Sequence, residues 1–464
     1  MGSMHTGLED HFSNYSQLAD YYCSRIKGGG PSLIVTGGIS PNREGRLGEC
    51  SGTLSHYGQL LPHKFLTHKV RKAGGRICMQ ILHAGRYGYH KDIVSCSSIK
   101  APINCFTPRE LETDEVEKQI DDYVKCAKLA EKAGYHGVEI MGSEGYFINQ
   151  FLCKRTNKRR DCWGGSFENR KKLAIQIVSR IRNETKENFI LIYRISVADL
   201  VEQGSEGKEI IDLAKSVEAQ GVNLINCGIG WHESRIPTIA SSVPVGAFSG
   251  AVRRVSMQVS VPVIATNRIN TPEAAEKLLS QGICQLVSMA RPFLADAQFV
   301  QKARENRSGE INVCIGCNQA CLDQIFDGNK TSCVVNPRTL NRPMVRILRS
   351  RKNIAVIGAG PAGMAVAFKA ALYGHEVLLF EGSDRIGGQF NLAKEIPGKK
   401  DYAHTIQYFH NQLGKLGVKI HLNTQVSHTN LSTIADSNFD HIVVATGANP
   451  RHCLLYTSPS PRDA

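Results

Sequence analysis

The chain has 464 residues, of which 42% are hydrophobic and 21% are charged, an ordinary globular composition that excludes disordered, collagen-like and coiled-coil chains. Lysine and arginine outnumber aspartate and glutamate by 56 to 42, a net charge of +14; without a zinc-finger, helix-turn-helix or RNA-binding signature, this excess favours a solvated basic surface over nucleic-acid binding. Because no apolar run reaches about 18 residues and the first residues lack a signal-peptide core, we expect a cytoplasmic protein with no membrane partner.

Seven short apolar runs recur along the chain up to residue 290, separated by stretches long enough for a helix. They lie at 32–35, 76–82, 137–142, 190–196, 224–228, 261–267 and 285–290. Apolar strands that alternate with amphipathic segments, such as 114–134 and 166–184, predict a parallel sheet covered by helices. A closed (β/α)8 barrel needs an eighth strand, and we interpret residues 3–5 as the end of a first strand that is mostly missing. An open sheet of seven strands remains the alternative.

Polar or glycine residues follow several of these runs. They are Gly37, Gly38, Gln80, His83, Arg194, Asn267, Arg268 and Arg291. In a barrel, the carboxyl ends of the strands meet at one face, which carries the active site. The pattern therefore predicts a site at this face, with Arg268 and Arg291 after the last strands, where barrels usually bind phosphate.

A cysteine cluster follows the predicted barrel, within residues 306–345. Four of the fifteen cysteines have the spacing C-x2-C-x3-C-x11-C; they are Cys314, Cys317, Cys321 and Cys333. Four thiolates in one short segment suit an iron–sulfur cluster or zinc. Three close cysteines and a distant fourth favour a [4Fe–4S] cluster, while zinc and coincidence remain alternatives. We interpret the other eleven cysteines as small buried side chains.

A dinucleotide-binding pattern begins at residue 352. The strand IAVIG leads into G-x-G-x-x-G, formed by Gly358, Gly360 and Gly363, and a helix and a second strand then end at Glu381. The glycines allow a pyrophosphate to approach a helix N-terminus, and an acid at this spacing is typical of contacts to a ribose hydroxyl. The pattern predicts a Rossmann-like domain over 352–450 that takes FAD or NAD, and it disfavours a 2′-phosphate at this site.

Several stretches together resemble one enzyme family: GSMHTGLE, QILHAGRYGY, EIMGSEGYFINQFL, GIGWHESRIPTIA, SMARPFLADA, CIGCNQACLDQIF and GGQFNLAKEIPGK. Over about residues 1–450 the chain resembles the bacterial-type NADPH-dependent 2,4-dienoyl-CoA reductases, iron–sulfur flavoproteins related to the old yellow enzymes and trimethylamine dehydrogenase. The resemblance implies an FMN-binding barrel over 1–305, a [4Fe–4S] segment and a partial FAD domain. Electrons would pass from NADPH through FAD, cluster and FMN to an acyl-CoA substrate, in the β-oxidation of unsaturated fatty acids.

The resemblance also implies a role for each matching residue. Tyr146 matches the proton donor, His232 its partner in substrate activation, and Arg155 a substrate contact. The implied FMN contacts are Ser3, Met4, His5, Gly38, Gln80, Arg194, Arg268, Ala290 and Arg291. The implied FAD contacts are Ala359, Glu381 and Gln389 beside the three motif glycines, and the four cysteines are the implied cluster ligands. A packed core tyrosine and a satisfied loop histidine remain the alternatives for Tyr146 and His232.

Three further features extend or limit this interpretation. The basic segment 154–160, KRTNKRR, suggests that Lys158, Arg159 and Arg160 help to hold the phosphates of coenzyme A, with a solvated face as the alternative.

The family's chains begin earlier and run on further, and NADPH needs a second G-x-G-x-x-G, so we expect a fragment without NADPH turnover. We interpret residues 453–464 as a non-native tail. A related enone reductase or amine dehydrogenase and a non-catalytic electron-transfer module remain alternative functions.

Overall fold

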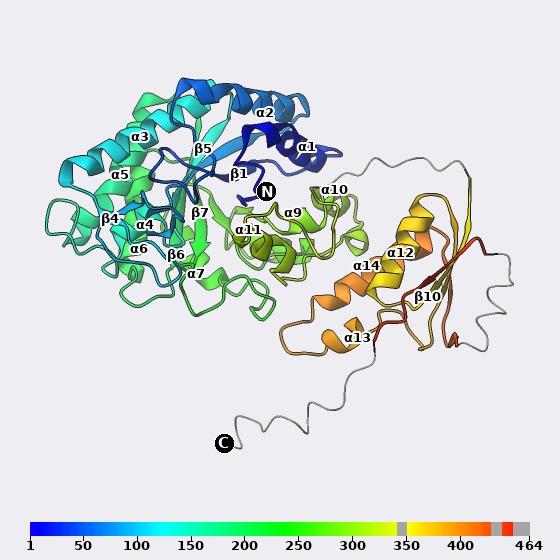
Figure 1. Ribbon diagram of the computed structural model, residues 1–464. Coiled ribbons are helices and arrows are strands. Elements are labelled where there is room, and N and C mark those ends of the chain that lie inside the picture. Colours follow the sequence, from blue (N-terminus) through cyan, green and yellow to red (C-terminus); the bar gives the residue numbers. More distant parts are fainter. Residues whose placement is uncertain (341–349, 428–438, 449–464) are drawn as a thin grey trace, which may run out of the picture. The chain divides into compact units, whose positions relative to one another are not determined.

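The computed structural model describes residues 1–340, 350–427 and 439–448, and the chain divides into two compact units, Met1–Arg342 and Pro343–Ala464 (Figure 1). The first unit contains a seven-stranded parallel sheet whose strand order, β1-β2-β5-β6-β7-β8-β9, follows the chain. The strands are β1 (Ile34–Ile39), β2 (Ile77–Ile81), β5 (Gly137–Gly142), β6 (Ile190–Ala198), β7 (Leu224–Ile229), β8 (Val263–Ala265) and β9 (Leu286–Val287). All seven predicted strands are thus confirmed.

The first residues of the chain link the two edge strands of this sheet. Val35 in β1 donates its backbone N–H to the carbonyl of Met1 (3.0 Å), and Gly2 donates to the carbonyl of Met289, just after β9 (2.8 Å). These bonds join β1 to the segment after β9 and favour the barrel-like arrangement over an open sheet. Met1 and Gly2 make this link, rather than the predicted residues 3–5, which lie beyond it.

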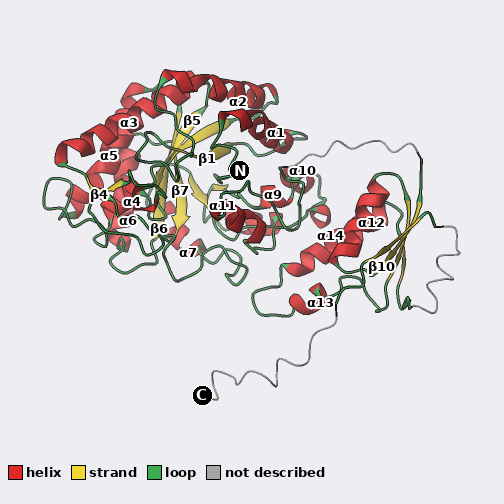
Figure 2. Cartoon of the chain, in the orientation of Figure 1, coloured by secondary structure: helices red, strands yellow, loops and turns green. Residues whose placement is uncertain are grey.

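Helices cover the outside of the sheet (Figure 2). They are α1 (Tyr15–Ile26), α2 (Leu60–Lys72), α3 (Thr113–Lys132), α5 (Phe167–Glu184), α6 (Gly207–Ala219), α7 (Ser249–Ser256) and α8 (Pro272–Ser280). In α3, buried residues at helical spacing, Val116, Ile120, Tyr123 and Ala127, form the inward stripe, and a capping box between Glu112 and Glu115 starts the helix. Strands β1, β2 and β5 are buried throughout, as parallel strands covered on both faces require.

Shorter helices and strands also belong to the first unit. They are β3 (Val94–Ser95), β4 (Arg109–Glu110), α4 (Phe147–Leu152), α9 (Pro292–Ala295), α10 (Phe299–Arg304) and α11 (Gln324–Phe326). The cysteine segment, predicted as a region of its own, belongs to this unit up to Arg342. Within the described ranges, no helix is both long and apolar enough to span a membrane.

The second unit is a four-stranded parallel sheet in the order β12-β11-β10-β13, with a hydrophobic core of its own. Its elements are β10 (Asn353–Ile357), α12 (Pro361–Leu372), β11 (Glu376–Phe380), α13 (Phe390–Ala393), α14 (Tyr402–Lys415), β12 (Lys419–His421) and β13 (His441–Val444). The crossover from β10 through α12 to the parallel neighbour β11 is the predicted Rossmann-type unit. The predicted tail, 453–464, lies outside the described residues.

Candidate active site

A chain of polar side chains crosses the sheet of the first unit. Ser3 donates its hydroxyl to Gln80 Oε1 (2.9 Å), and Gln80 Nε2 donates to Glu139 Oε1 (2.8 Å). Asn226, on β7, donates its amide to the other oxygen of Glu139 (2.6 Å). Glu139 is fully buried on β5, and its two hydrogen bonds orient the amides of β2 and β7. The sequence predicts Ser3 and Gln80 as site residues but not Glu139 and Asn226. The only sign of these two in the sequence is that each is a polar residue within a predicted apolar strand.

Tyr146 and His232 meet beyond the carboxyl ends of β5 and β7. Tyr146 precedes the first residue of α4, and its hydroxyl lies 3.0 Å from Nε2 of His232, in the loop after β7. The ring of Tyr87 stands edge-on to both, with ring centroids 5.9 Å from Tyr146 and 5.8 Å from His232. The two residues that the sequence nominated for catalysis are therefore direct hydrogen-bond partners.

The surroundings of this pair shift both pKa values away from the ordinary range. Burial raises the pKa of Tyr146 above its usual value, and the charge of Glu144 adds to this rise while Arg194 opposes it. Desolvation by the surrounding atoms lowers the pKa of His232, although the residue as a whole is exposed. At neutral pH, Tyr146 therefore holds its proton and His232 is neutral. A neutral phenol beside a neutral imidazole can transfer a proton to a reacting group.

A salt bridge ties β6 to the turn that carries Tyr146. Arg194, at the predicted position on β6, pairs with Glu144 at 2.6 Å. Glu144 has a left-handed backbone, φ 54°, which bends the chain after β5 and presents its carboxylate to β6. Both side chains are largely buried, and the pairing raises the pKa of Arg194 further above its usual range. Arg194 is therefore a permanent positive charge below the Tyr146–His232 pair.

A second buried carboxylate anchors the predicted substrate contact. Glu233 has a side chain with no exposed area, and it accepts from Arg155 Nε (2.8 Å) and from the hydroxyl of Tyr87 (3.0 Å). Arg86 forms a further ion pair with the same carboxylate. Arg155 remains about one-third exposed (30%), and its two Nη atoms have no hydrogen-bond partner among the described residues. Sequence reasoning missed Glu233, which follows His232 directly.

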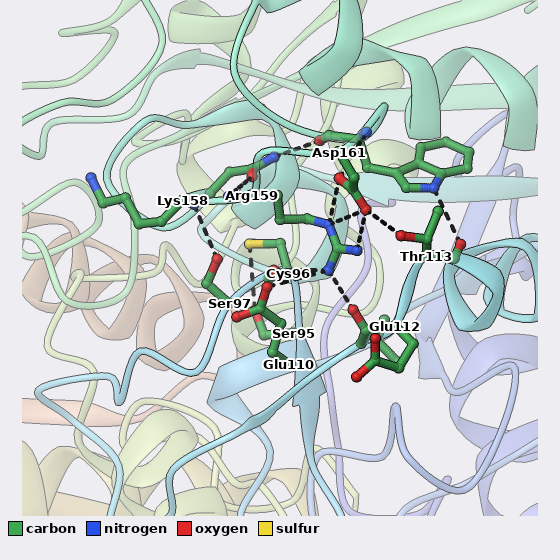
Figure 3. A network of polar contacts seen from close by, with 12 residues as sticks. Ser95, Cys96, Ser97, Glu110, Glu112, Thr113, Lys158, Arg159 and Asp161 are labelled. Atoms are coloured by element: carbon green, nitrogen blue, oxygen red, sulfur yellow. Dashed lines mark hydrogen bonds and ion pairs between the residues drawn. The ribbon is translucent and has the colours of Figure 1, made fainter.

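The basic segment 154–160 does not present all its charges outward, as Figure 3 shows. Arg159 is buried, and its guanidinium pairs with Asp161 and donates to the carbonyl oxygens of Cys96 and Leu111. The prediction that Arg159 faces coenzyme A is therefore wrong, because the side chain is used to hold surrounding loops together. Lys158 and Arg160 are exposed.

The predicted phosphate contacts lie after β8 and β9. Arg268 is buried and donates Nε to the carbonyl of Val243 (2.7 Å), and Arg291 donates Nη2 to the carbonyl of Ile239 (2.8 Å). Both guanidinium groups thus reach the 239–243 loop. Ala290 is half-buried directly before Arg291. Two cations at this end of a barrel fit the phosphate of a flavin mononucleotide.

The remaining predicted FMN contacts differ in their surroundings. A side chain on Gly38 would lie 2.7 Å from the side chain of Leu82, so only glycine fits there. Met4 is half-buried, and His5 bonds to Asp10 (3.1 Å). Asp10 thus holds His5 beside the strand ends and was not predicted.

The four predicted cluster ligands face one pocket. Cys314, Cys317, Cys321 and Cys333 line it together with Arg291. In the described part of the chain, no three histidine, cysteine or acidic side chains stand close enough to hold a single metal ion. Four thiols that line one pocket suit a group held by four cysteines, a [4Fe–4S] cluster or a zinc ion.

Four other cysteines contradict the interpretation that the remaining eleven are buried. Cys50, Cys105 and Cys162 are exposed and Cys23 is half-buried, while Cys453 lies outside the described residues. The buried ones are Cys78, Cys96, Cys126, Cys153, Cys227 and Cys284.

The second unit brings together its predicted dinucleotide residues. The backbone N–H of Ala359 donates to the carboxylate of Glu381 (2.7 Å), so the glycine turn and the end of β11 touch. Gly358 has φ 101°, and a side chain there would lie 2.4 Å from the carbonyl of Ala445. Gly360 caps α12, Gly363 lies in its first turn, and Gln389 donates to the carbonyl of Ala448 (3.0 Å). A bare helix N-terminus beside an acid fits the pyrophosphate and ribose of FAD or NAD.

Comparison with known proteins gives matches over both units. Residues 1–310 match the NADH:flavin oxidoreductase / NADH oxidase family, and residues 352–458 match the pyridine nucleotide-disulphide oxidoreductase family. A "Metal reductase" of Desulforamulus reducens is 36% identical, with 97% of this chain and 68% of the relative aligned. An "NADH oxidase" of Thermoanaerobacter brockii is 32% identical over 97% of this chain and 70% of the relative.

Solved structures are also similar to this chain. A 2-naphthoyl-CoA reductase in complex with 2-naphthoyl-CoA superposes with a TM-score of 0.91 at 31% identity, over 97% of this chain and 72% of that chain. A histamine dehydrogenase from Rhizobium, at 22% identity and a TM-score of 0.83, shares the fold. These relatives are named for different substrates, and none of them is called a dienoyl-CoA reductase.

Proposed function

We propose that the substrate of this chain is a conjugated acyl-CoA thioester of the 2,4-dienoyl-CoA type. The premise is that the chain belongs to the NADH:flavin oxidoreductase / NADH oxidase family and is a flavin-dependent oxidoreductase. The observation that carries this proposal is the 3.0 Å hydrogen bond between Tyr146 and His232 at the carboxyl ends of the strands. Reduction of a conjugated thioester needs a hydride and then a proton, and this pair is a proton donor next to a polar partner. The 31% identical structure that binds 2-naphthoyl-CoA supports a CoA thioester as substrate.

The first unit holds the groups that would bind FMN. Ser3, Gln80 and Arg194 would contact the flavin ring, and Arg268, Ala290 and Arg291 its phosphate; Met4, His5 and Gly38 would line the same site. When bound and reduced, FMN supplies a hydride to the conjugated double bond. The hydroxyl of Tyr146 then gives its proton to the carbon that carries the developing negative charge, so that the substrate gains two electrons and two hydrogens in total.

His232 and Arg155 would act on the thioester itself. Negative charge develops on the thioester oxygen as the hydride arrives, and a hydrogen-bond donor at that oxygen lowers the barrier. His232 is within reach of such a position because it already contacts Tyr146. Arg155 binds Glu233 through Nε, and its Nη atoms would contact the substrate.

The electron path would use the remaining sites. Cys314, Cys317, Cys321 and Cys333 would hold a [4Fe–4S] cluster, which transfers electrons one at a time. FAD would be held by the residues of the glycine turn and its neighbours, with NADPH as the electron donor; they are Gly358, Ala359, Gly360, Gly363, Glu381 and Gln389.

Metal analysis tests the cluster: the purified chain is expected to contain iron and not zinc, and its reduction is expected to give the paramagnetic signal of a reduced cluster. Stoichiometric zinc would overturn this assignment.

The substrate can be tested without relying on NADPH. We would reduce the flavin of the purified chain by light under anaerobic conditions, mix it with 2,4-decadienoyl-CoA, and follow the return of the oxidised flavin spectrum. We expect reoxidation to be much faster than with buffer alone, and we expect monoenoyl-CoA as the product. If the saturated analogue decanoyl-CoA reoxidises the flavin as fast, or if the dienoyl ester does not, the proposal is wrong.

A second candidate function has one specific observation in its favour. The 36% identical relative is a metal reductase, so the same photoreduced protein should also be mixed with ferric citrate. Flavin reoxidation by ferric citrate but not by the dienoyl ester would replace our proposal by metal reduction.

Flavin reduction by trimethylamine, starting from the oxidised protein, would indicate an amine dehydrogenase. An absence of bound FMN would favour an electron-transfer module.

A further inference from the structure

Asp199 is a buried carboxylate next to the proposed site for which the mechanism above has no use. It follows β6 directly and is only 3% exposed. Within residues 1–340, 350–427 and 439–448, no lysine, arginine or histidine forms an ion pair with it. A buried charge of this kind is costly unless hydrogen bonds replace the water that it has lost. The surroundings of Asp199 supply those bonds.

Four donors from three separate segments satisfy the carboxylate. Its Oδ1 accepts from the indole Nε1 of Trp231 (2.8 Å) and from the amide Nδ2 of Asn149 (3.3 Å). Its Oδ2 accepts from the backbone N–H of Ser205 (2.6 Å) and from the thiol of Cys153 (3.1 Å). An indole N–H and a backbone N–H can only donate. The position therefore requires a side chain that accepts at both ends, which aspartate does and asparagine does not.

One of these bonds leads to Tyr146. Asn149 lies in α4, and its second amide atom, Oδ1, accepts the backbone N–H of Gly145 (2.9 Å). Gly145 immediately precedes Tyr146 and has φ 81°. Asp199 thus orients the Asn149 amide, and this amide fixes the turn from which the Tyr146 side chain extends.

Another bond leads to His232. Trp231 precedes His232, and it is held to Asp199 twice: the indole binds the carboxylate, and the backbone N–H of Trp231 donates to the carbonyl of Asp199 (2.9 Å). The indole of Trp231 also lies against Gly145, the residue before Tyr146: a Cβ atom added to Gly145 would be 2.8 Å from the indole. Asp199 therefore holds Trp231, the neighbour of His232, directly, and holds Gly145, the neighbour of Tyr146, through Asn149.

We propose that Asp199 is a positioning residue that keeps Tyr146 and His232 at hydrogen-bond distance. The inference rests on the proposed function of that pair and adds the group that sets their geometry. Asp199 touches neither of the two side chains, so its effect passes through Asn149 and Trp231. A misplacement of about 1 Å in such a pair can cost roughly 100-fold in rate.

The first test is the isosteric variant Asp199→Asn. With the photoreduced protein, kcat and KM are the limiting rate and the half-saturating concentration of flavin reoxidation by the dienoyl ester. We expect this kcat to fall by roughly 10- to 100-fold in Asp199→Asn, with KM within about threefold, because Asp199 acts only through the residues around the pair. In a His232→Ala background, the same substitution should have a smaller effect on kcat than in the wild type, since the Tyr146–His232 distance is already lost and only the turn before Tyr146 is still disturbed. A full additional loss in that background would overturn the proposal. The matched control is Asp161→Asn, which breaks a buried network elsewhere and should leave kcat unchanged.

The second test needs no substrate. The 15N chemical shift of His232 Nε2 reports its hydrogen bond with Tyr146, and the signal is assigned by its loss in His232→Ala. We expect Asp199→Asn to move this signal to the position seen in Tyr146→Phe, whereas Asp161→Asn leaves it in place. An unmoved signal in folded Asp199→Asn contradicts the proposal. If the signal moves but the wild-type protein does not reduce the dienoyl ester, the positioning role stands and the proposed substrate fails.

A milder variant covers the case in which Asp199→Asn does not fold. Trp231→Phe keeps an aromatic ring in place but removes one donor to Asp199. We expect the same direction of change in the His232 signal and a loss of kcat of roughly threefold to 10-fold. A folded Trp231→Phe protein with the wild-type signal and wild-type kcat would overturn the proposal.

Discussion

Tyr146 and His232 lie 86 residues apart in the chain and still form a 3.0 Å hydrogen bond. Two ion pairs lie next to this bond in the chain. Arg194 pairs with Glu144 beside Tyr146, and Glu233 binds Arg155 beside His232. Because the surrounding protein raises the pKa of Tyr146 and lowers that of His232, both residues stay neutral over the physiological range. A proton donor that keeps its proton at neutral pH is what a reductase needs.

These pKa shifts predict the pH dependence of the proposed reaction. Tyr146 stays protonated above its ordinary pKa of about 10, and His232 stays neutral down to below its ordinary 6.5. We expect the rate of flavin reoxidation by the dienoyl ester to be flat between about pH 7 and 9, and Tyr146→Phe to lower it by roughly 100-fold or more. Stopped-flow measurements from about pH 6 to about pH 9 test the expectation. A rate that titrates near pH 6.5 in the wild type but not in His232→Ala would contradict it.

At the scale of single elements, the loops after the strands do more than carry catalytic residues. The loop that contains Arg159 is fixed by a guanidinium that reaches Asp161 and two backbone carbonyls (Figure 3). Its neighbours Lys158 and Arg160 remain exposed. Adjacent basic residues of one sequence segment therefore have opposite functions, one structural and two available to a ligand.

This division can be tested by substitution within the segment. The double variant Lys158→Glu, Arg160→Glu should raise KM for the CoA ester by roughly threefold or more at low ionic strength and less at high salt, because exposed charges are screened. Arg159→Gln should leave KM unchanged but lower the free energy of unfolding by about 2 kcal/mol, since it leaves buried carbonyls without a donor. The concentration dependence of flavin reoxidation by the CoA ester at two salt concentrations measures KM, and urea denaturation measures the free energy of unfolding. An unchanged KM in the double variant at low salt would eliminate the proposed phosphate contact.

In the second unit, the glycine turn between β10 and α12 is limited by space. A side chain on Gly363 would lie 1.8 Å from the carbonyl of Gly358, so Gly363→Ala must shift the turn away from β10. We expect this variant to lose FAD on gel filtration while it keeps FMN in the first unit. Gly414→Ala in α14 is the matched control: no atom lies within 4 Å of the added carbon, and the helix should gain about 0.5–1 kcal/mol. Retention of FAD by Gly363→Ala would contradict the assignment of this turn.

At the scale of the whole molecule, the sequence predicts some features much better than others. The seven strands could be predicted because parallel strands buried on both faces are continuous apolar runs. The cysteine and glycine motifs could be predicted because their chemistry depends on short, fixed spacings. Glu139, Asp199 and Glu233 could not, because each is defined by partners that are far away in the chain and meet only in the folded barrel. The inward direction of Arg159 was missed for the same reason.

The buried histidines of the first unit predict how the stability of the protein depends on pH. Burial lowers the pKa of both His63 and His83 from 6.5 to about 3, and His63 is enclosed by the hydroxyls of Tyr15 (3.2 Å) and Tyr135 (2.9 Å). Below pH 6.5 the unfolded chain takes up protons that the folded chain excludes until about pH 3, so the free energy of unfolding falls over this interval.

At pH 5 the loss should amount to roughly 2 kcal/mol for each histidine relative to pH 7, which urea denaturation of the first unit's tertiary signal at the two pH values can measure. His63→Gln should be less stable than the wild type at pH 7, because the tyrosines lose their shared partner, but its stability should fall less steeply toward pH 5. His11→Gln, at an exposed position, is the control and should keep the wild-type slope of the free energy of unfolding against pH.

Equal slopes for the wild type and His63→Gln would mean that the buried His63 ring takes up its proton as readily in the folded chain as in the unfolded one. The hydrogen bonds to Tyr15 and Tyr135 would then have to break and re-form around a charged imidazole at no cost, which a site without solvent does not allow.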